Sequence, residues 1–252
     1  MDSDNAANKT AVSDTSAVTI TKPGDMWTVE KALLEMPTYE LTRTSTTSPL
    51  HFFHLLGQLK RTERKGWKRF SINRVESIAD HMYRMATMAM FPPRSLRPRL
   101  DINKCIKMCL VHDMAESLVG DITPADRVPR VEKIERETLA MNHIVESLGD
   151  TISGSDELHT LWCEFEASET LESRFVQDLD KLELLLQMLE YEWDENSDLS
   201  EFAYVYTKIT LPEMQCWAEE TLSKRRKHLI KKEAPERTVC TREMQDQYYT
   251  AK

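Results

Sequence analysis

Ionisable side chains continue an apolar helical stripe in the segment from Ile102 to Glu116. Apolar residues and cysteines recur there at spacings of three and four, and one turn later the same face carries His112, Asp113 and Glu116. Burying such groups without partners costs on the order of several kcal/mol. A divalent metal is the most economical explanation, because His and Asp are ligands for cations and a glutamate one turn away can reach a metal-bound water.

Two other segments carry similar groups. His81 lies among isoleucine and methionine side chains on the apolar face of a predicted helix, and alone it would be read as an ordinary core residue. Asp180 lies in a predicted helix that is apolar nearly all round, where a buried carboxylate needs a cation; spacing alone leaves Asp178 as its alternative. Together with the first segment, these residues offer two imidazoles and two carboxylates. This mixed set suits Mn, Fe, Co or Zn and leaves coordination positions open for water, which indicates catalysis.

Helices are the elements expected to hold these residues, because no alternating strand pattern and no internal repeat occur in the sequence. Ser77 is the expected N-cap of the helix that carries His81, with Asp80 at the capping-box position. The segment Gly120–Pro124 is expected to be a tight loop. The predicted helices are Leu50–Arg61, Ser77–Phe91, Ile102–Leu118, Val128–Leu148, Glu157–Glu166, Glu169–Tyr191 and Leu211–Lys232. We therefore expect one all-α domain, a single helical bundle over residues 49–232.

The composition limits the classes of function. The chain has 252 residues, 40% of them hydrophobic and only 6 glycines, which suits one helical core with tails rather than a turn-rich β protein. A net charge of -9 argues against a dedicated nucleic-acid binder, although a local cationic cluster would still bind a small phosphorylated substrate. Five cysteines without a C-x-x-C pair favour a reducing compartment, so we expect a cytoplasmic protein.

The two ends of the chain differ from the domain between them. Residues 1–48 are polar and rich in Ser and Thr, and are expected to be mostly disordered, with docking left open for the apolar patches Met26-Trp27 and Ala32-Leu33-Leu34. The start has no apolar region typical of a secretory signal, and no run of 18 apolar residues would span a membrane. The basic run Lys224–Lys227 precedes a tail over residues 233–252; a solvated helix end is favoured over a nuclear address.

Four stretches together resemble a known family: Glu76–Met85 around His81, Leu110–Glu116 around His112-Asp113, Gly120–Asp126, and Gln177–Lys181 around Asp180. The pattern is similar to the H…HD…D signature of the HD-domain metal-dependent phosphohydrolases. Within them it resembles the HD domain-containing protein 2 group, relatives of the bacterial 5'-deoxynucleotidase. The resemblance covers about residues 50 to 220. It implies an HD-domain helical bundle that hydrolyses deoxyribonucleoside 5'-monophosphates, commonly as a homodimer, and it favours Asp180 over Asp178.

The resemblance also implies roles for particular residues. One divalent ion would be held by His81, His112, Asp113 and Asp180. Active-site acids would be Glu116 and Asp121, and nucleotide contacts would come from Arg64, Trp67 and a glutamate at Glu164 or Glu166, with Glu166 carried as the candidate. The residue types suit this chemistry, since arginine binds phosphate bidentately and a carboxylic acid kept protonated by burial can serve as a general acid.

Several alternatives stay open at this point. Glu116 could orient the attacking water instead, Asp121 is expected at the sugar, and Trp67 either offers an apolar face to the nucleoside or only packs. The substrate could be a triphosphate or a cyclic nucleotide. The chain could also be a helical scaffold that keeps the metal site without turnover, although intact ligands and Glu116 weigh against that reading.

Overall fold

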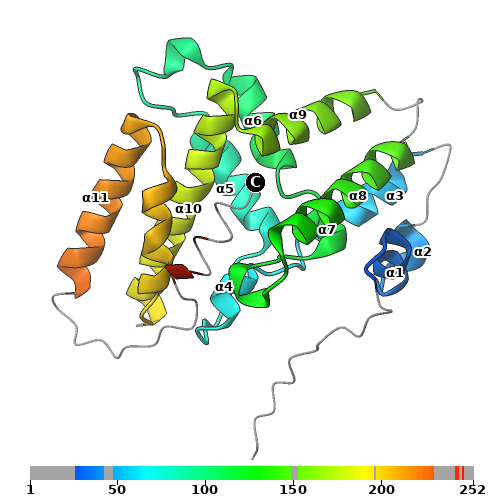
Figure 1. Cartoon of the computed structure of the whole chain (residues 1–252), viewed down its shortest axis with the longest axis horizontal. Coiled ribbons are helices and arrows are strands. Elements are labelled where there is room, and N and C mark those ends of the chain that lie inside the picture. Colours follow the sequence, from blue (N-terminus) through cyan, green and yellow to red (C-terminus); the bar gives the residue numbers. More distant parts are fainter. Residues whose placement is uncertain are drawn as a thin grey trace, which may run out of the picture.

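The computed structural model describes residues 26–42, 48–148, 153–195, 197–229, 242–243 and 246. Over these residues the chain forms helices and turns, with no strand and one isolated bridge between Glu63 and Ser77. Figure 1 shows the arrangement. The longer α-helices are α5 (Ile78–Ala89), α6 (Ile102–Val111), α8 (Arg130–Leu148), α9 (Ser155–Ala167), α10 (Leu171–Glu195) and α11 (Pro212–Leu229). Shorter elements are α1 (Val29–Leu34), α2 (Tyr39–Thr42), α3 (Leu50–Leu56), α4 (Lys65–Lys68), α7 (Glu116–Val119), η1 (Arg97–Arg99), η2 (Pro124–Asp126) and η3 (Ser200–Lys208). The all-α prediction is confirmed.

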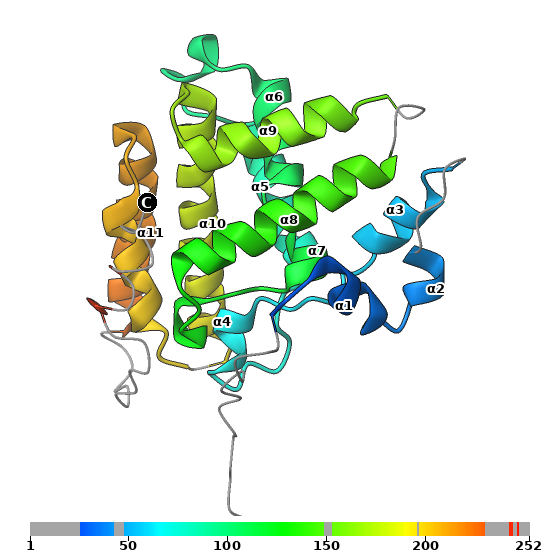
Figure 2. The same cartoon turned by 45° about the vertical axis from the view of Figure 1, so that its right-hand side comes forward.

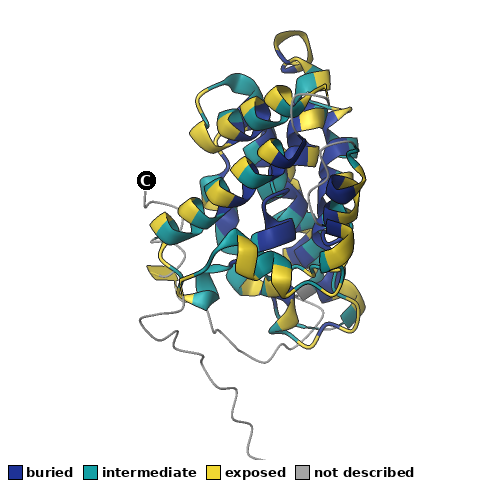
Figure 3. Cartoon of the chain, turned by 90° about the vertical axis from the view of Figure 1, so that its right-hand side faces the viewer, coloured by how far each residue is buried: buried dark blue, intermediate teal, exposed yellow. Residues whose placement is uncertain are grey.

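The centre of the bundle is formed by α5, α6 and α10, which pack on one another (Figure 2). On one side α11 and η3 pack along α10, and on the other α9 packs on α6 and α8 on α9. The interior is apolar, with Met85, Phe175 and Leu185 fully buried, and the buried positions face inward across the bundle (Figure 3). This packing fixes the relative positions of the three central helices, so side chains on their facing surfaces are held in place.

The helix that begins at Ile102 is shorter than predicted. α6 ends at Val111, His112 is its C-cap, and a separate short helix, α7, begins at Glu116. Between them the backbone turns, with hydrogen bonds from Met114 N–H to Val111 O and from Glu116 N–H to Asp113 O. The prediction of one helix over Ile102–Leu118 is therefore wrong. The i to i+3 bonds tighten the chain at this point, and they set Asp113 on a turn rather than on a helical face.

The N-terminal region contains more structure than the sequence indicated. Residues 26–42 form α1, capped by the Thr28 side chain, and α2. Trp27, Ala32 and Leu33 pack against the core, and α1 contacts α7 and α8. The prediction that residues 1–48 are mostly disordered is wrong for 26–42, because the two apolar patches supply enough contact to dock. Residues 1–25 and 43–47 lie outside the described residues.

The C-terminal helix, α11, is described as far as Leu229, so the predicted end at Lys232 and most of the tail 233–252 lie outside the described residues. One member of the basic run is not solvated: Arg225 is buried and donates to both carboxylate oxygens of Glu192 at 2.7 Å. The 3-10 segment η3 was not predicted at all. Within the described part of the chain, no helix combines the length and the apolar character needed to cross a membrane.

Candidate active site

The first imidazole of the site belongs to α5. The helix begins with the capping box that the sequence predicted, in which Ser77 and Asp80 satisfy each other's backbone N–H groups. His81 follows in the first turn and is completely buried. Its Nδ1 lies 2.6 Å from Oε2 of Glu183 on α10, and Arg84 Nε donates to the other oxygen of Glu183 at 2.7 Å. Since a carboxylate accepts, Nδ1 carries the proton and the lone pair of Nε2 faces away from Glu183.

The second imidazole lies at the end of α6. Nδ1 of His112 is 2.9 Å from the carbonyl oxygen of Cys109, which can only accept, so this ring also presents the lone pair of Nε2. Nε2 of His112 and Nε2 of His81 are both buried and make no hydrogen bond. Two buried imidazole nitrogens without hydrogen bonds, each with its other nitrogen fixed as a donor, are the arrangement found around a metal ion.

Two carboxylates complete this set. Oδ2 of Asp113 lies 3.2 Å from Nε2 of His112 and 3.8 Å from Nε2 of His81. Oδ1 of Asp180, on α10, lies 3.2 Å from Nε2 of His81. The ligand atoms of His81, His112 and Asp113 all lie within 4.8 Å of one another. The structure therefore brings the four predicted ligands together from α5, the turn after α6, and α10, and their nitrogen and oxygen donors fit a divalent transition metal.

Asp178 is directed elsewhere. Its carboxylate accepts hydrogen bonds from the backbone N–H of Thr210 at 3.0 Å and of Leu211 at 2.7 Å, just before α11. These contacts satisfy N–H groups at the start of a helix, so Asp178 has a structural role. The geometry separates two residues that sequence spacing could not.

The four predicted ligands, His81, His112, Asp113 and Asp180, are called the metal cluster below. Their electrostatics indicate a site for positive charge. Burial opposes ionisation of Asp113 and Asp180, but the neighbouring histidines and Arg64 hold the pKa of both carboxyls below the ordinary value. Burial and Arg64 lower the pKa of His81, yet the charges of Glu183 and Asp180 outweigh them and raise it to about 10. A divalent cation would replace the proton that these carboxylates attract.

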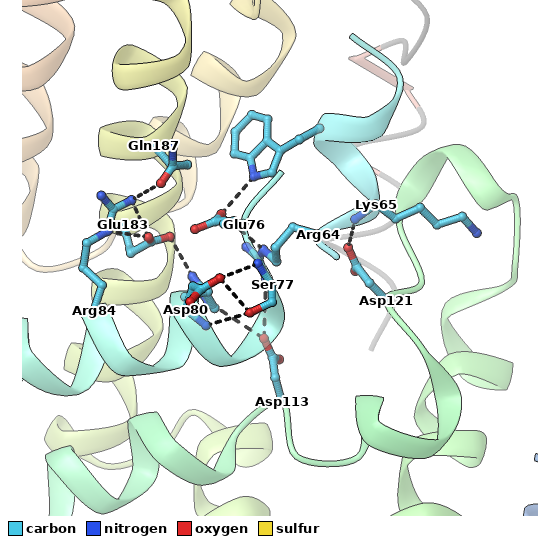
Figure 4. A network of polar contacts seen from close by, with 12 residues as sticks. Arg64, Lys65, Glu76, Ser77, Asp80, Arg84, Asp113, Asp121, Glu183 and Gln187 are labelled. Atoms are coloured by element: carbon cyan, nitrogen blue, oxygen red, sulfur yellow. Dashed lines mark hydrogen bonds and ion pairs between the residues drawn. The ribbon is translucent and has the colours of Figure 1, made fainter. Parts of the chain in front are cut away.

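Arg64 lies at the edge of the cluster (Figure 4). Its Nη1 is 3.4 Å from Oδ2 of Asp113, its Nη2 is 4.0 Å from Oδ1 of Asp180, and its Nε is 3.9 Å from Oε1 of Glu76. Although burial lowers the pKa of Arg64, the charges of Asp121, Asp113 and Asp180 raise it well above the ordinary value. A permanently charged guanidinium beside the ligand carboxylates can bind a phosphoryl group that approaches the metal.

Trp67 is buried against other aromatic side chains. Its ring centroid lies 4.3 Å from that of Phe202 and 5.5 Å from that of Tyr191, and its Nε1 donates to Glu76 at 2.9 Å. Only 2% of the residue is exposed. It borders the pocket, but these contacts are mainly packing, and a direct nucleotide contact by Trp67 stays a prediction.

The two predicted active-site acids lie in different surroundings. Glu116 is 3% exposed, and its Oε2 is buried without a hydrogen bond. Burial, followed by the charges of Asp113 and Asp121, raises the pKa of Glu116 well above its ordinary value, so the acid is kept protonated. Asp121 accepts a hydrogen bond from the backbone N–H of Lys65 at 2.6 Å, which ties its loop to α4.

One pocket, which holds about 980 Å³ of space including its mouth, is lined by Trp67, Arg64, the two predicted acids and the two ligand carboxylates. Its charged lining residues are Arg64, Arg69, Asp113, Glu116, Asp121, Lys133, Asp180, Lys181 and Glu201. Its apolar wall is formed by Ile122, Leu184, Phe202 and Val205. A pocket that combines charged groups with an apolar wall suits a small phosphorylated molecule with an apolar body.

Glu164 and Glu166, the two candidates for the further glutamate, lie in different surroundings. Glu164 pairs with Lys104 at 2.6 Å and accepts a hydrogen bond from Thr170, away from the metal cluster. Glu166 borders a second cavity that includes His112, Asp113 and Asp180. It does not border the first pocket, and a nucleotide contact by Glu166 stays a prediction.

Three residues near the cluster were missed from the sequence: Glu183, Glu76 and Phe202. Glu183 follows Asp180 by three residues and so shares its helix face, a spacing that could have identified it. Glu76 precedes the N-cap of α5, and no local pattern marks it. Phe202 lies in η3, which has no periodicity to detect.

Comparison with known proteins identifies the family. The family model described as HD domain matches residues 56–217, more than half of the chain. The chain belongs to the HD domain family. The human protein named 5'-deoxynucleotidase HDDC2 is 47% identical over 145 residues, which cover 58% of this chain and 69% of that protein. The fission yeast Schizosaccharomyces pombe protein named 5'-deoxynucleotidase hdd1 is 38% identical over 189 residues, covering 73% and 94%. Among solved structures, HD domain-containing protein YGK1(YGL101W) aligns with a TM-score of 0.59 and 28% identity over 81% of this chain and 99% of that chain.

Proposed function

We propose that this HD-domain protein is a metal-dependent 5'-deoxynucleotidase, which hydrolyses deoxyribonucleoside 5'-monophosphates to deoxynucleoside and phosphate. The observation that carries the proposal is the convergence of two imidazole Nε2 atoms and two carboxylates beside a pocket that the two carboxylates line together with Arg64 and Glu116. The names of the human and fission yeast relatives support the same activity.

One divalent ion would be held by His81, His112, Asp113 and Asp180. The donor set suits Mn, Co, Fe or Zn. When bound, such an ion lowers the pKa of a coordinated water and neutralises charge on a phosphate oxygen. Scaffold function without turnover is disfavoured because Glu116 is buried beside the ligands, where an ionisable group without a chemical task would only cost stability.

The protein's own residues would perform the remaining steps. Arg64 binds the phosphoryl oxygens with its guanidinium. Glu116, protonated in its buried position, donates a proton to the leaving 5'-oxygen, while Asp121 fixes its loop against α4 and faces the sugar. The wall of Leu184, Phe202 and Val205 receives the nucleoside and excludes water from it.

A monophosphate fits this arrangement better than a triphosphate. The lining of the pocket includes the cations Arg64, Arg69, Lys133 and Lys181, and also the acids Asp113, Glu116, Asp121, Asp180 and Glu201. A chain of three phosphates would bring more negative charge to a lining that has no excess of cations.

We also propose that the protein is a cytoplasmic homodimer that does not bind nucleic acid. Exposed apolar side chains on α5 and just after it, Tyr83 and Phe91, are candidates for the dimer contact, and light scattering after gel filtration would measure it.

The substrate is tested by measuring phosphate release from matched pairs of deoxy- and ribonucleoside 5'-monophosphates, together with deoxynucleoside triphosphates and cyclic nucleotides. The protein is first stripped of metal and then given Mn, Co, Zn or Mg. We expect turnover of the deoxymonophosphates only. Equal turnover of the ribonucleotides would contradict the deoxy preference, and no turnover with any metal would favour the scaffold.

A further inference from the structure

The metal cluster opens not only into the pocket described above but also into a second chamber. The two cavities share Asp113, Asp180, Lys133 and Lys181, so they meet at the cluster. These four shared residues form the junction of the two cavities. Away from the junction, the second chamber is bordered by residues of α8, α9, α10 and η3: Arg130, Ile134, Glu137, Phe165, Glu166, Gln177 and Lys208. A substrate held at the junction would therefore have space on two sides.

The second chamber differs chemically from the first pocket. Its lining includes four cationic side chains. Lys133 and Lys181 are shared with the first pocket, whereas Arg130 and Lys208 border the second chamber alone, and Arg64 and Arg69 border the first pocket alone. Each of the four cations of the second chamber is held by local contacts. For example, Nζ of Lys133 lies 3.3 Å from Glu137, Lys181 donates to the carbonyl oxygen of Gln177 at 2.8 Å, and Nζ of Lys208 lies 3.1 Å from Asp246. Fixed cations that surround a cavity are suited to a small, highly charged anion.

Two glutamates border the same chamber. Burial raises the pKa of Glu137 to about 7 and that of Glu166 above its ordinary value. The protonated form of Glu137, which a pKa of about 7 retains in part at neutral pH, has an O–H group that can donate to a phosphate oxygen. Burial also lowers the pKa of Lys181, so burial acts on both the acids and the cations of this lining.

The acids on the two sides of the junction are different. Glu116 and Asp121 border the first pocket and not the second chamber, whereas Glu137 and Glu166 border the second chamber and not the first pocket. In phosphoryl transfer to water, the attacking and leaving oxygens lie roughly in line on opposite sides of phosphorus. With the nucleoside and Glu116 on the first side, the attacking water must come from the side of the second chamber.

We propose that the second chamber is a phosphate subsite, which admits the attacking water and receives the released phosphate, so that phosphate and deoxynucleoside leave the metal cluster by separate routes. This inference rests on the proposed function. During the displacement the phosphorus–oxygen bond to the 5'-oxygen breaks, and a bond to the oxygen of water forms. Glu116 gives its proton to the 5'-oxygen, and one proton of the attacking water passes to solvent, from which Glu116 is reprotonated. The phosphoryl group keeps the oxygen and the other hydrogen of that water and moves toward the chamber.

The test compares binding of the two products to the metal-loaded full chain by calorimetry, with inorganic phosphate and a deoxynucleoside as separate titrants. The variants are Arg130→Gln and Lys208→Gln. Lys65→Met is the matched control, since the Lys65 side chain pairs with Asp126 and borders neither cavity. Melting temperatures of all variants show that each is folded before it is titrated.

We expect Arg130→Gln and Lys208→Gln to weaken phosphate binding about five- to tenfold while deoxynucleoside binding stays at the wild-type level, and Lys65→Met to change neither. Wild-type phosphate affinity in both chamber variants would overturn the subsite, as would equal loss of phosphate and nucleoside affinity. Because binding is measured without turnover, phosphate binding in the chamber combined with no hydrolysis of deoxynucleotides would overturn the proposed function and leave the subsite standing.

Discussion

Oε2 of Glu183 lies 2.6 Å from Nδ1 of His81, and this contact turns the other imidazole nitrogen toward His112, Asp113 and Asp180. Glu183 is itself held by Arg84, so a chain of buried contacts runs from α5 to α10 and back to the metal cluster (Figure 4). Carboxylates in this position fix the tautomer of a ligand histidine and increase its basicity.

Replacing Glu183 by glutamine should weaken metal binding by about 10- to 100-fold. The neutral amide of glutamine lacks the full negative charge with which the carboxylate holds the Nδ1–H group of His81. The His81 ring is therefore less well oriented, and its Nε2 is less basic. The measurement is metal retention against a competing chelator. Glu190→Gln is the control, because Glu190 contacts Arg84 on the exposed side of the same helix. Unchanged retention in Glu183→Gln would show that the contact serves packing alone.

Replacing each of the two aspartates of α10 by alanine should affect different properties: metal content for Asp180 and fold stability for Asp178. Asp180→Ala removes a proposed ligand, so metal content should fall while the melting temperature of the metal-free protein changes little. Asp178→Ala leaves the N–H groups of Thr210 and Leu211 without their acceptor, and should destabilise the fold by about 1 to 3 kcal/mol with metal content retained. Thermal unfolding and elemental analysis measure the two effects. Metal loss in Asp178→Ala but not in Asp180→Ala would reverse the assignment.

Glu116→Gln should lower kcat by about 10²- to 10⁴-fold with little change in metal content. Burial and the charges of Asp113 and Asp121 raise the pKa of this acid, so the wild-type rate should fall as pH rises through that pKa and the general acid loses its proton. The variant has no such proton to lose, so its rate should not show this fall at high pH. The same fall in the variant would assign the titration to another group.

Glu137 should make stability depend on pH. Its pKa of about 7 lies above the ordinary value of 4.5, so the unfolded chain releases the proton first as pH rises. The contribution of Glu137 to the free energy of unfolding is therefore most favourable below about pH 4.5. It becomes less favourable as pH rises to about 7 and stays so at higher pH. Glu137→Gln should raise the stability of metal-free protein on the order of 2 kcal/mol at pH 8, with no gain at pH 4.

The control for this effect is Glu132→Gln on the same helix, where the glutamate side chain is 45% exposed and pairs with Arg136. Thermal unfolding at both pH values should show no gain in this control. A stabilisation of Glu137→Gln that is equal at pH 4 and pH 8 would contradict the linkage to burial.

The sequence was informative where local periodicity or chemistry constrains the chain. The capping box at Ser77 and the inward position of His81 follow from α5 alone, and the structure has both. It was misleading at His112-Asp113, where the stripe predicted a continuous helix but the chain turns, because i to i+3 hydrogen bonds depend on packing that periodicity does not encode. The pairing of Glu183 with His81 and the wall formed by η3 join residues far apart in sequence, and only the folded chain brings them together.

The central proposal is that His81, His112, Asp113 and Asp180 would hold one divalent ion and that the hydrolysis of deoxyribonucleoside 5'-monophosphates by this protein depends on that ion. The most direct measurement is phosphate release from one such deoxymonophosphate while metal is added back in steps to stripped protein. We expect no activity without metal and a rise that levels off at one ion per chain, absent in Asp113→Ala. Activity that persists in thoroughly stripped protein, or that is unchanged in Asp113→Ala, would contradict the account.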